Sequence, residues 1–352
     1  MTTRIAINGF GRIGRCVLRA LYEHGYRNDL QVVAINELAD IDTISYMLRY
    51  DSTHGRFPGT VEVADERHLL VNGDRICVRH IAELSELDWQ ALDVDIVLEC
   101  SGQVTSRDDA EQHLHAGARR VLISNPADSA VDNTIIYGLN QHSLTAEQRI
   151  VSNGSCSTNC LLPLLTLLDN AFGIEAGVTT TIHSAMNDQP VIDAYHSDLR
   201  RTRAAGQSII PVDTGLPLGI ARLMPKLAGK IESLHVRVPT INVSALDISL
   251  QLQQITSSQA VNDLIQSAAA GHLRGILGIT REAHASIDFN HDARSGIVDA
   301  TQTRVSGGHL LKLLVWFDNE WGFANRMLDT ARCMSSLPSG PNSVNPVVQP
   351  PK

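Results

Sequence analysis

Residues 5–14, Ile-Ala-Ile-Asn-Gly-Phe-Gly-Arg-Ile-Gly, decide how the first half of the chain folds. The first four residues form a short apolar strand, and apolar residues then recur at helical spacing up to Gly25. Gly9, Gly11 and Gly14 therefore lie between a strand and a helix. Their Gly-x-Gly-x-x-Gly spacing is typical of a turn that binds the pyrophosphate of a dinucleotide.

A second apolar run, 31–35, ends at Asn36 and Glu37. An acidic residue here accepts hydrogen bonds from the adenosine ribose, and its charge repels a 2′-phosphate, so Glu37 predicts NAD rather than NADP. The alternative is that Glu37 only caps the strand end. Further strand-like runs, such as 95–100 and 120–124, indicate a parallel Rossmann-type sheet and an α/β fold.

A second strand-to-helix turn spans residues 152–160, Ser-Asn-Gly-Ser-Cys-Ser-Thr-Asn-Cys, and the helix after it should end at Gly173. Cys156 lies near the first free N–H groups of that helix. The positive end of the helix dipole favours a thiolate, which predicts a lowered pKa for Cys156. The same turn could hold an anion or an oxyanion. The alternative is that Cys156 is a small buried side chain and Ser155 only caps the helix.

In the second half, a β-branched strand over 178–183 places His183 at its end. The stretch 185–207 has little regular pattern, and loops of this length are usually functional. Its basic segment, 200–203, could bind phosphate or could pin the loop through salt bridges. Few crossover helices separate the later strands, so an α+β domain with a mainly antiparallel or mixed sheet is expected. These strands are predicted at 233–238, 243–252, 286–289, 296–301 and 309–317.

The expected organisation is two domains and a tail. Residues 1–155 and a C-terminal helix over 319–334 form the NAD-binding domain, and 156–318 form the catalytic domain. Residues 335–352 are rich in Pro and Ser and are expected to be disordered.

The composition argues against several classes of partner and site. The 352 residues carry a net charge of −9, which argues against nucleic acid or an acidic membrane surface as a partner. No apolar stretch is long enough to span a bilayer, and no N-terminal signal is visible before Ile5. The six cysteines lack metal-ligand or disulfide spacing, so reduced thiols, no metal and a cytoplasmic location are expected.

Over roughly residues 2–334 the sequence resembles the glyceraldehyde-3-phosphate dehydrogenase family. The matching stretches occur in order along the chain: 7–15, 50–55, 152–160, 181–184, 237–240 and 318–322. The resemblance implies an NAD-dependent aldehyde dehydrogenase that acts on a small phosphorylated aldose and assembles as a homotetramer.

The resemblance also implies residue roles. Cys156 would be the nucleophile and His183 the base. Asn319 would orient the nicotinamide carboxamide, and an inter-subunit ion pair is the alternative for Arg237. Backbone N–H groups of Arg12 and Ile13 would bind the pyrophosphate of the cofactor. Arg201 and Arg237 would bind the substrate phosphate. Contacts to phosphate or substrate near Cys156 would come from Ser155, Ser157, Thr214 and Gly215.

One departure from the family pattern stands out. Met186 occupies a position where the family usually has a threonine that helps to hold the substrate phosphate. A thioether cannot donate that hydrogen bond, which predicts an altered substrate pocket. The aldose itself, and water or phosphate as the acceptor of the thioester, stay open. A non-catalytic NAD-binding or thiol-sensing protein with the same fold is a further alternative.

Overall fold

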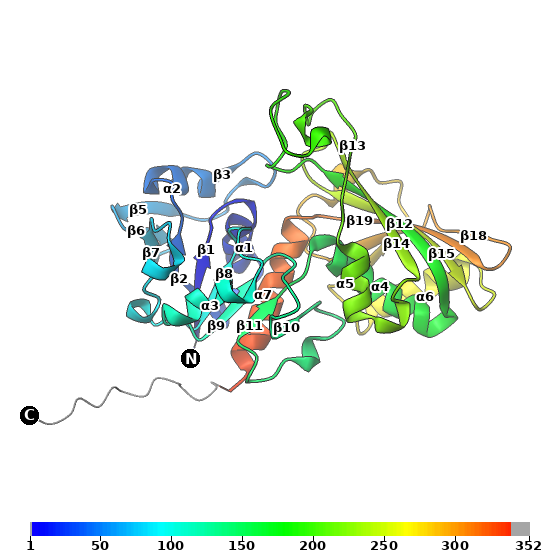
Figure 1. Cartoon of the computed structure of the whole chain (residues 1–352), viewed down its shortest axis with the longest axis horizontal. Helices are drawn as coiled ribbons and strands as arrows, with labels where there is room; N and C mark the ends of the chain where they lie inside the picture. Colours follow the sequence, from blue (N-terminus) through cyan, green and yellow to red (C-terminus); the bar gives the residue numbers. More distant parts are fainter. Residues whose placement is uncertain (1, 339–352) are drawn as a thin grey trace, which may run out of the picture.

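Two large β-sheets, each with its own helices, lie side by side in the computed structural model (Figure 1), which describes residues 2–338. The first sheet has nine strands in the order β10-β11-β9-β8-β1-β2-β7-β6-β5. It is parallel except at the β5-β6-β7 edge. Its strands are β1 (Thr3–Asn8), β2 (Leu30–Asn36), β5 (Val61–Asp65), β6 (His68–Val71), β7 (Asp74–Arg79), β8 (Ile96–Glu99), β9 (Arg120–Ile123), β10 (Asn133–Thr134) and β11 (Ile150–Ser152).

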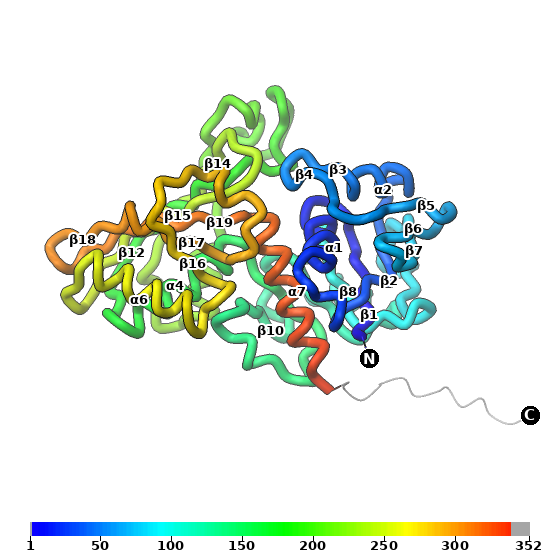
Figure 2. Tube along the Cα trace, turned by 180° about the vertical axis from the view of Figure 1, so that it is seen from behind, coloured from blue at the N-terminus to red at the C-terminus, as the bar shows by residue number. Residues whose placement is uncertain are grey.

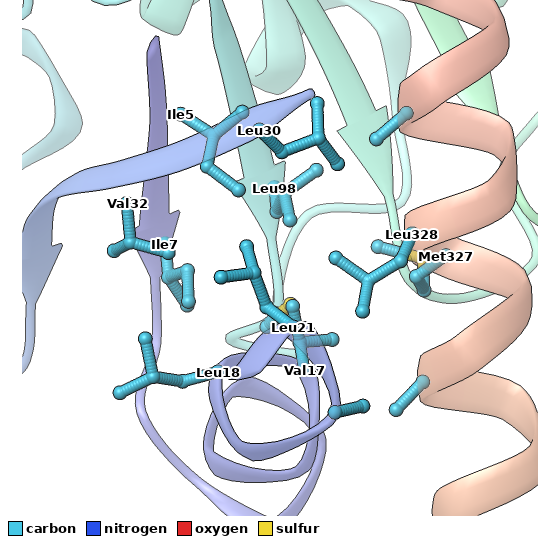
Figure 3. Packing of buried hydrophobic residues seen from close by; sticks show 14 of the residues in the cluster. Ile5, Ile7, Val17, Leu18, Leu21, Leu30, Val32, Leu98, Met327 and Leu328 are labelled. Carbon is cyan, nitrogen blue, oxygen red and sulfur yellow. The ribbon is translucent and has the colours of Figure 1, made fainter. Parts of the chain in front are cut away.

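The helices of this half are α1 (Arg12–Glu23), α2 (Ile41–Arg49) and α3 (Arg107–His115), and a small hairpin joins β3 (Tyr50–Asp51) to β4 (Gly55–Arg56). Val17, Leu18 and Leu21 of α1 recur at helical spacing and pack on Ile5 and Ile7 of β1 (Figure 3). The last helix, α7 (Trp321–Ser336), returns from the far end of the sequence and packs against α1. Figure 2 shows α7 running between the two halves of the molecule.

The second sheet has eight strands, ordered β13-β14-β12-β15-β19-β17-β16 with β18 beside β19. It is mixed and mainly antiparallel, as expected, since only β12-β14 and β16-β17 run parallel. Its strands are β12 (Ile174–Ser184), β13 (Ile210–Val212), β14 (Ile231–Val238), β15 (Ser244–Leu252), β16 (Leu277–Thr280), β17 (Gly296–Asp299), β18 (Arg304–Ser306) and β19 (Leu310–Phe317). The helices α4 (Cys156–Phe172), α5 (Leu216–Leu223) and α6 (Ser258–Ala270) contribute apolar side chains to the same core.

Two predictions about local structure are wrong. Ser286–Phe289, expected as a strand, is a 3-10 helix, because the Asp288 side chain accepts from the Ala285 N–H at 2.8 Å and closes the turn. The tail was expected from residue 335, but α7 continues to Ser336. Arg120 holds that end by donating to the Met334 carbonyl at 2.7 Å. The rest of the expected tail, 339–352, lies outside the described residues.

Among the residues that the structure describes, no helix is both long enough and apolar enough to cross a membrane.

Candidate active site

The three glycines after β1 serve different purposes. A Cβ on Gly9, whose φ is +85°, would lie 2.5 Å from the Ser101 backbone, and one on Gly14 would lie 2.2 Å from the Gly9 carbonyl oxygen. A Cβ on Gly11 would have no non-neighbouring atom of residues 2–338 within 4 Å. Packing therefore requires Gly9 and Gly14, whereas Gly11 leaves open space at the start of α1, where pyrophosphate approaches in dinucleotide folds.

The first turn of α1 is uncapped by any side chain, because its N-cap residue is Gly11. The N–H groups of Arg12 and Ile13 have no acceptor among the described residues. Their positive ends suit a phosphate.

A cavity of about 340 Å³ opens beside this turn, at the carboxyl ends of β1, β2 and β8. Glu37 and Ala82 are among its lining residues. The Glu37 carboxylate accepts from the N–H groups of Phe10 and Leu38, both at 2.8 Å. It keeps further acceptor capacity for ribose hydroxyls. The uncapped turn, the space over Gly11 and this acceptor together fit NAD.

A buried polar network beneath the cavity escaped the sequence analysis. The Trp89 indole N–H donates to Nδ1 of His113 at 3.0 Å, so the proton of His113 is on Nε2, which lies 2.8 Å from Glu99. Glu99 also accepts from the Asn8 amide at 2.6 Å and the Ser101 N–H at 2.7 Å. Burial opposes the charge on Glu99, but these hydrogen bonds outweigh it and lower the pKa of the carboxyl. The carboxylate thus ties the ends of β1 and β8 together.

The second strand-to-helix turn, between β11 and α4, carries side chains that cap the helix. The helix α4 begins at Cys156 and ends at Gly173, as predicted. Ser155 is its N-cap, and the Ser155 hydroxyl accepts from the Thr158 N–H at 3.1 Å. The capping interpretation of Ser155 is therefore confirmed, and Cys156 stands on the first position of the helix.

The fold brings His183 from the end of β12 to Cys156. Nε2 of His183 lies 3.6 Å from the Cys156 sulfur. Nδ1 lies 2.8 Å from the Ser184 carbonyl, and a carbonyl only accepts, so Nδ1 carries the proton. The Nε2 lone pair therefore faces the thiol. The ring of His235, which the sequence analysis did not single out, stacks on His183 with centroids 5.1 Å apart.

The prediction of a lowered pKa for Cys156 is wrong for this structure. Cys156 is half-buried, and its loss of water raises the pKa of the thiol more than Ser157 and Arg237 lower it. Burial, helped by the charge of Arg237, lowers the pKa of His183 to about 4. Both shifts favour a neutral thiol–imidazole pair, in which the thiol proton can pass to Nε2 during attack on a carbonyl.

Arg237 is the cation nearest to this pair. It lies directly beside His183 in the β12-β14 register, with Nη1 3.4 Å from Nδ1 of His183, and is only 8% exposed. Among the described residues it has no carboxylate partner within salt-bridge distance, so its charge is open to an anion. The Arg237 side chain lies inside this chain rather than on an outer face.

Arg201 is held inside its own loop. It pairs with Asp188 at 3.0 Å and Asp198 at 3.5 Å, and Arg203 pairs with Asp193 at 3.1 Å. The salt-bridge interpretation of the basic segment is therefore confirmed for these two arginines. Burial lowers the pKa of His235, and the charges of Arg237 and Arg201 lower it further.

Thr214 and Gly215 precede α5, where the Leu216 N–H donates to the Thr214 hydroxyl at 3.2 Å. A Cβ on Gly219 of α5 would lie 3.7 Å from the Thr158 hydroxyl of α4. The first turns of the two helices therefore lie together, and Ser157 is buried on α4. Two helix N-termini at one place suit an anion.

Asn319 follows β19 and precedes α7. Its side-chain oxygen accepts from Ser184 at 3.0 Å and Ser244 at 2.8 Å, two residues that the sequence analysis did not assign to the site. The next residue, Glu320, pairs with the guanidinium of Arg12, which also lies 2.5 Å from Asp51. This link joins the first glycine turn to the Cys156 site.

Cys16, His54 and Glu320 bring three possible metal-ligand atoms within 4.8 Å of one another. Glu320 is already neutralised by Arg12 and accepts from His54 at 3.0 Å. This pairing leaves the group unsuited to a cation.

Two comparisons with protein families agree with this geometry. Residues 3–107 match the family described as glyceraldehyde 3-phosphate dehydrogenase, NAD binding domain. Residues 155–319 match glyceraldehyde 3-phosphate dehydrogenase, C-terminal domain.

Proposed function

The chain belongs to the glyceraldehyde 3-phosphate dehydrogenase family and is an NAD-dependent oxidoreductase, and on that premise we propose that it oxidises D-erythrose 4-phosphate to 4-phospho-D-erythronate. The product would enter pyridoxal 5′-phosphate biosynthesis. Cys156 is the nucleophile in this proposal and His183 the base. Stretches 34–40, 183–186 and 208–214 resemble those of D-erythrose-4-phosphate dehydrogenase.

The observation that carries the choice of aldose is Met186. It lies three residues after His183, is 41% exposed, and has no side-chain donor for a phosphate. The phosphate of erythrose 4-phosphate is one carbon further from the aldehyde than that of glyceraldehyde 3-phosphate. A site that lacks the usual threonine beside the base suits the longer substrate. Arg237 is the first cation for its phosphate, and Arg201 is the second, which would exchange its contacts with Asp188 and Asp198 for that phosphate.

The residues can perform each step. As the Cys156 sulfur bonds to the aldehyde carbon, the thiol proton passes to Nε2 of His183 and then to the carbonyl oxygen, which gives a thiohemiacetal. Bound NAD supplies the acceptor for the hydride from that carbon. Nε2 takes back the hydroxyl proton, so a thioester remains on Cys156. After His183 releases that proton to solvent, Nε2 takes a proton from the water that attacks the thioester and returns it to the Cys156 sulfur as the C–S bond breaks, so the acid and the free thiol form.

The decisive experiment compares kcat/KM for the two aldehydes, with and without inorganic phosphate. We expect a preference for erythrose 4-phosphate and no requirement for phosphate. A preference for glyceraldehyde 3-phosphate with a phosphate requirement would instead support the alternative, a phosphorylating glyceraldehyde-3-phosphate dehydrogenase.

The substitution Met186→Thr sharpens this comparison. It should move the ratio of kcat/KM values toward glyceraldehyde 3-phosphate by about tenfold, because one phosphate hydrogen bond is regained. Met186→Leu restores no donor and serves as the matched control. Equal ratios in the two variants would remove Met186 as the determinant.

The remote alternative is a non-catalytic NAD-binding or thiol-sensing protein. It requires that oxidation of Cys156 changes partner binding while no aldehyde is turned over. The 3.6 Å contact between the sulfur and Nε2 of His183 weighs against it, because a proton acceptor at that place serves a nucleophile.

We also propose a homotetramer in the cytoplasm, with neither nucleic acid nor a membrane as partner. The loop after β12 lies at the top of Figure 1. Several of its large apolar side chains are exposed, as expected of an interface, and four of them are more than three-quarters exposed. They are Val191, Ile192, Tyr195 and Leu199, which are 88%, 77%, 107% and 82% exposed. Gel filtration with light scattering tests the assembly, and a monomer would contradict it.

A further inference from the structure

The amide of Asn319 is held by two strands of the second sheet. Ser184 ends β12 and Ser244 begins the neighbouring strand β15. Both serines are almost fully buried, at 0% and 1% exposure, and both hydroxyls donate to Oδ1 of Asn319. Asn319 itself is 9% exposed.

The two hydroxyl protons fix which way this amide faces. The Ser244 oxygen already accepts from the Ser184 N–H at 3.1 Å, so its own proton is left to donate. Oδ1 of Asn319 is the acceptor that the structure gives to each of the two hydroxyls. Rotating the amide by 180° would present N–H groups to the serines and leave two buried hydroxyl protons without an acceptor. Nδ2 must therefore point away from the serines.

The other side of the amide is free to donate. Nδ2 of Asn319 has no hydrogen-bond partner within residues 2–338. Oδ1 is saturated by the serines, so this amide can recognise an acceptor but can accept little itself. It lies in the same site as the thiol, because the Ser184 carbonyl holds Nδ1 of His183 and the Ser184 hydroxyl holds Asn319.

We propose that Ser184 and Ser244 are positioning residues that keep Asn319 as a one-way donor to the carboxamide oxygen of nicotinamide. The hydride acceptor must lie beside the carbon that bonds to Cys156, and the carboxamide is the polar group on that ring. The inference rests on the proposed function in taking Cys156 as the reacting atom. Whether the aldose has three or four carbons does not enter it.

The contacts that Ser184 makes with His183 and with Asn319 can be separated experimentally. Its backbone carbonyl orients His183, and its side chain orients Asn319, so Ser184→Ala removes only the second contact. Ser244→Ala removes the other hydroxyl, and the double variant releases the amide to rotate. NAD⁺ and ADP-ribose, which lacks nicotinamide, are the ligands to compare by equilibrium binding in the absence of any aldehyde.

We expect the double alanine variant to bind NAD⁺ about tenfold more weakly and ADP-ribose within about twofold of the original affinity. Ser244→Thr in the otherwise unchanged chain keeps a hydroxyl and should retain the NAD⁺ preference. Ser233→Ala is the matched control, since Thr179 of the same sheet, at 2.9 Å, is the one side-chain partner of its hydroxyl among residues 2–338. It should leave both affinities unchanged.

Either of two results would overturn the inference. One is an unchanged ratio of NAD⁺ to ADP-ribose affinity in the double variant. The other is an equal loss for both ligands, which would show that the serines only support the fold. Because no aldehyde is present, a wrong assignment of the substrate would leave the binding ratios unaffected and would appear only in the kinetic comparison.

Discussion

The chain has two strand-to-helix turns of the same topology, and they differ in the side chains at the start of the helix. Between β1 and α1 the N-cap is Gly11, without a side chain, and the first N–H groups of the helix have no partner among the described residues. Between β11 and α4 the N-cap is Ser155, whose hydroxyl satisfies the Thr158 N–H, and the next residue is Cys156. The turn before α1 therefore leaves space and free N–H groups for a ligand, whereas the turn before α4 carries a capping hydroxyl and a thiol.

The difference indicates that the first turn suits a bound phosphate and that the second offers a group that could react. A dinucleotide phosphate needs backbone approach and therefore an absence of Cβ atoms. A thiol that attacks carbonyls needs a base and a nearby cation, which here come from the neighbouring strands β12 and β14 as His183 and Arg237. Substitutions in the two turns should therefore fail in different ways.

Cys156→Ser should have the largest effect. A serine hydroxyl is a far weaker nucleophile beside this imidazole, so aldehyde oxidation should fall about 10⁴-fold or more, with NAD affinity retained. Steady-state turnover and NAD titration measure the two quantities. Cys333→Ser, at a half-buried cysteine of α7, is the control. Full turnover by the Cys156 variant would refute the mechanism.

His183→Asn removes the proton acceptor 3.6 Å from the sulfur and should lower kcat about 10²- to 10⁴-fold. The unfolding temperature and NAD affinity should change little, because the thiol and the first turn remain. A kcat within twofold of the original would exclude His183 as the base.

Gly11→Ala and Gly14→Ala form a matched pair within the first turn. The Gly11 variant should fold normally and bind NAD about tenfold more weakly, because its Cβ fills the space left for pyrophosphate. The Gly14 variant should lose about 1–3 kcal/mol of unfolding free energy, because its Cβ would lie 2.2 Å from the Gly9 oxygen. Urea unfolding and NAD titration separate the two effects; a reversed pattern would contradict the assignment.

Arg237→Gln should have the smallest effect of these substitutions, a shift in the pH dependence of the Cys156 thiol. The charge of Arg237 lowers the pKa of both the Cys156 thiol and the His183 imidazole, so its removal should raise both. The pH profile of Cys156 alkylation by iodoacetamide should consequently move to higher pH. Arg237→Lys keeps the charge and should move the profile less. A shift to lower pH would show that another group dominates the thiol.

The sequence predicted the elements whose signals are local. Asn72 and Gly73, with φ of 49° and 84°, make the hairpin turn between β6 and β7 that an Asn-Gly pair favours. The same kind of signal predicted the glycine turn, the start of α4 and the stop at Gly173. It failed for Ser286–Phe289, because a short alternating run is equally compatible with one helical turn, and the contact of Asp288 selects the turn.

The sequence indicated which residues form the site better than it indicated their pKa values. The turn singled out Cys156 and the family resemblance implied His183, but the lowered pKa expected for the thiol was not met, because desolvation depends on what packs around the sulfur. Asp188, His235, Ser184 and Ser244 were missed. A single polar residue on a strand carries no signal until its neighbours in the sheet are known.

By itself, then, the sequence determined where the backbone must turn and which chemistry each turn could offer, because glycines, caps and hydrophobic spacing act within a few residues. The tertiary structure decided which imidazole meets the sulfur, how the Arg237 guanidinium acts on both, and which way the Asn319 amide faces. Those properties arise from residues 27 to 135 positions apart in the chain, where burial and hydrogen-bond partners are set only by packing.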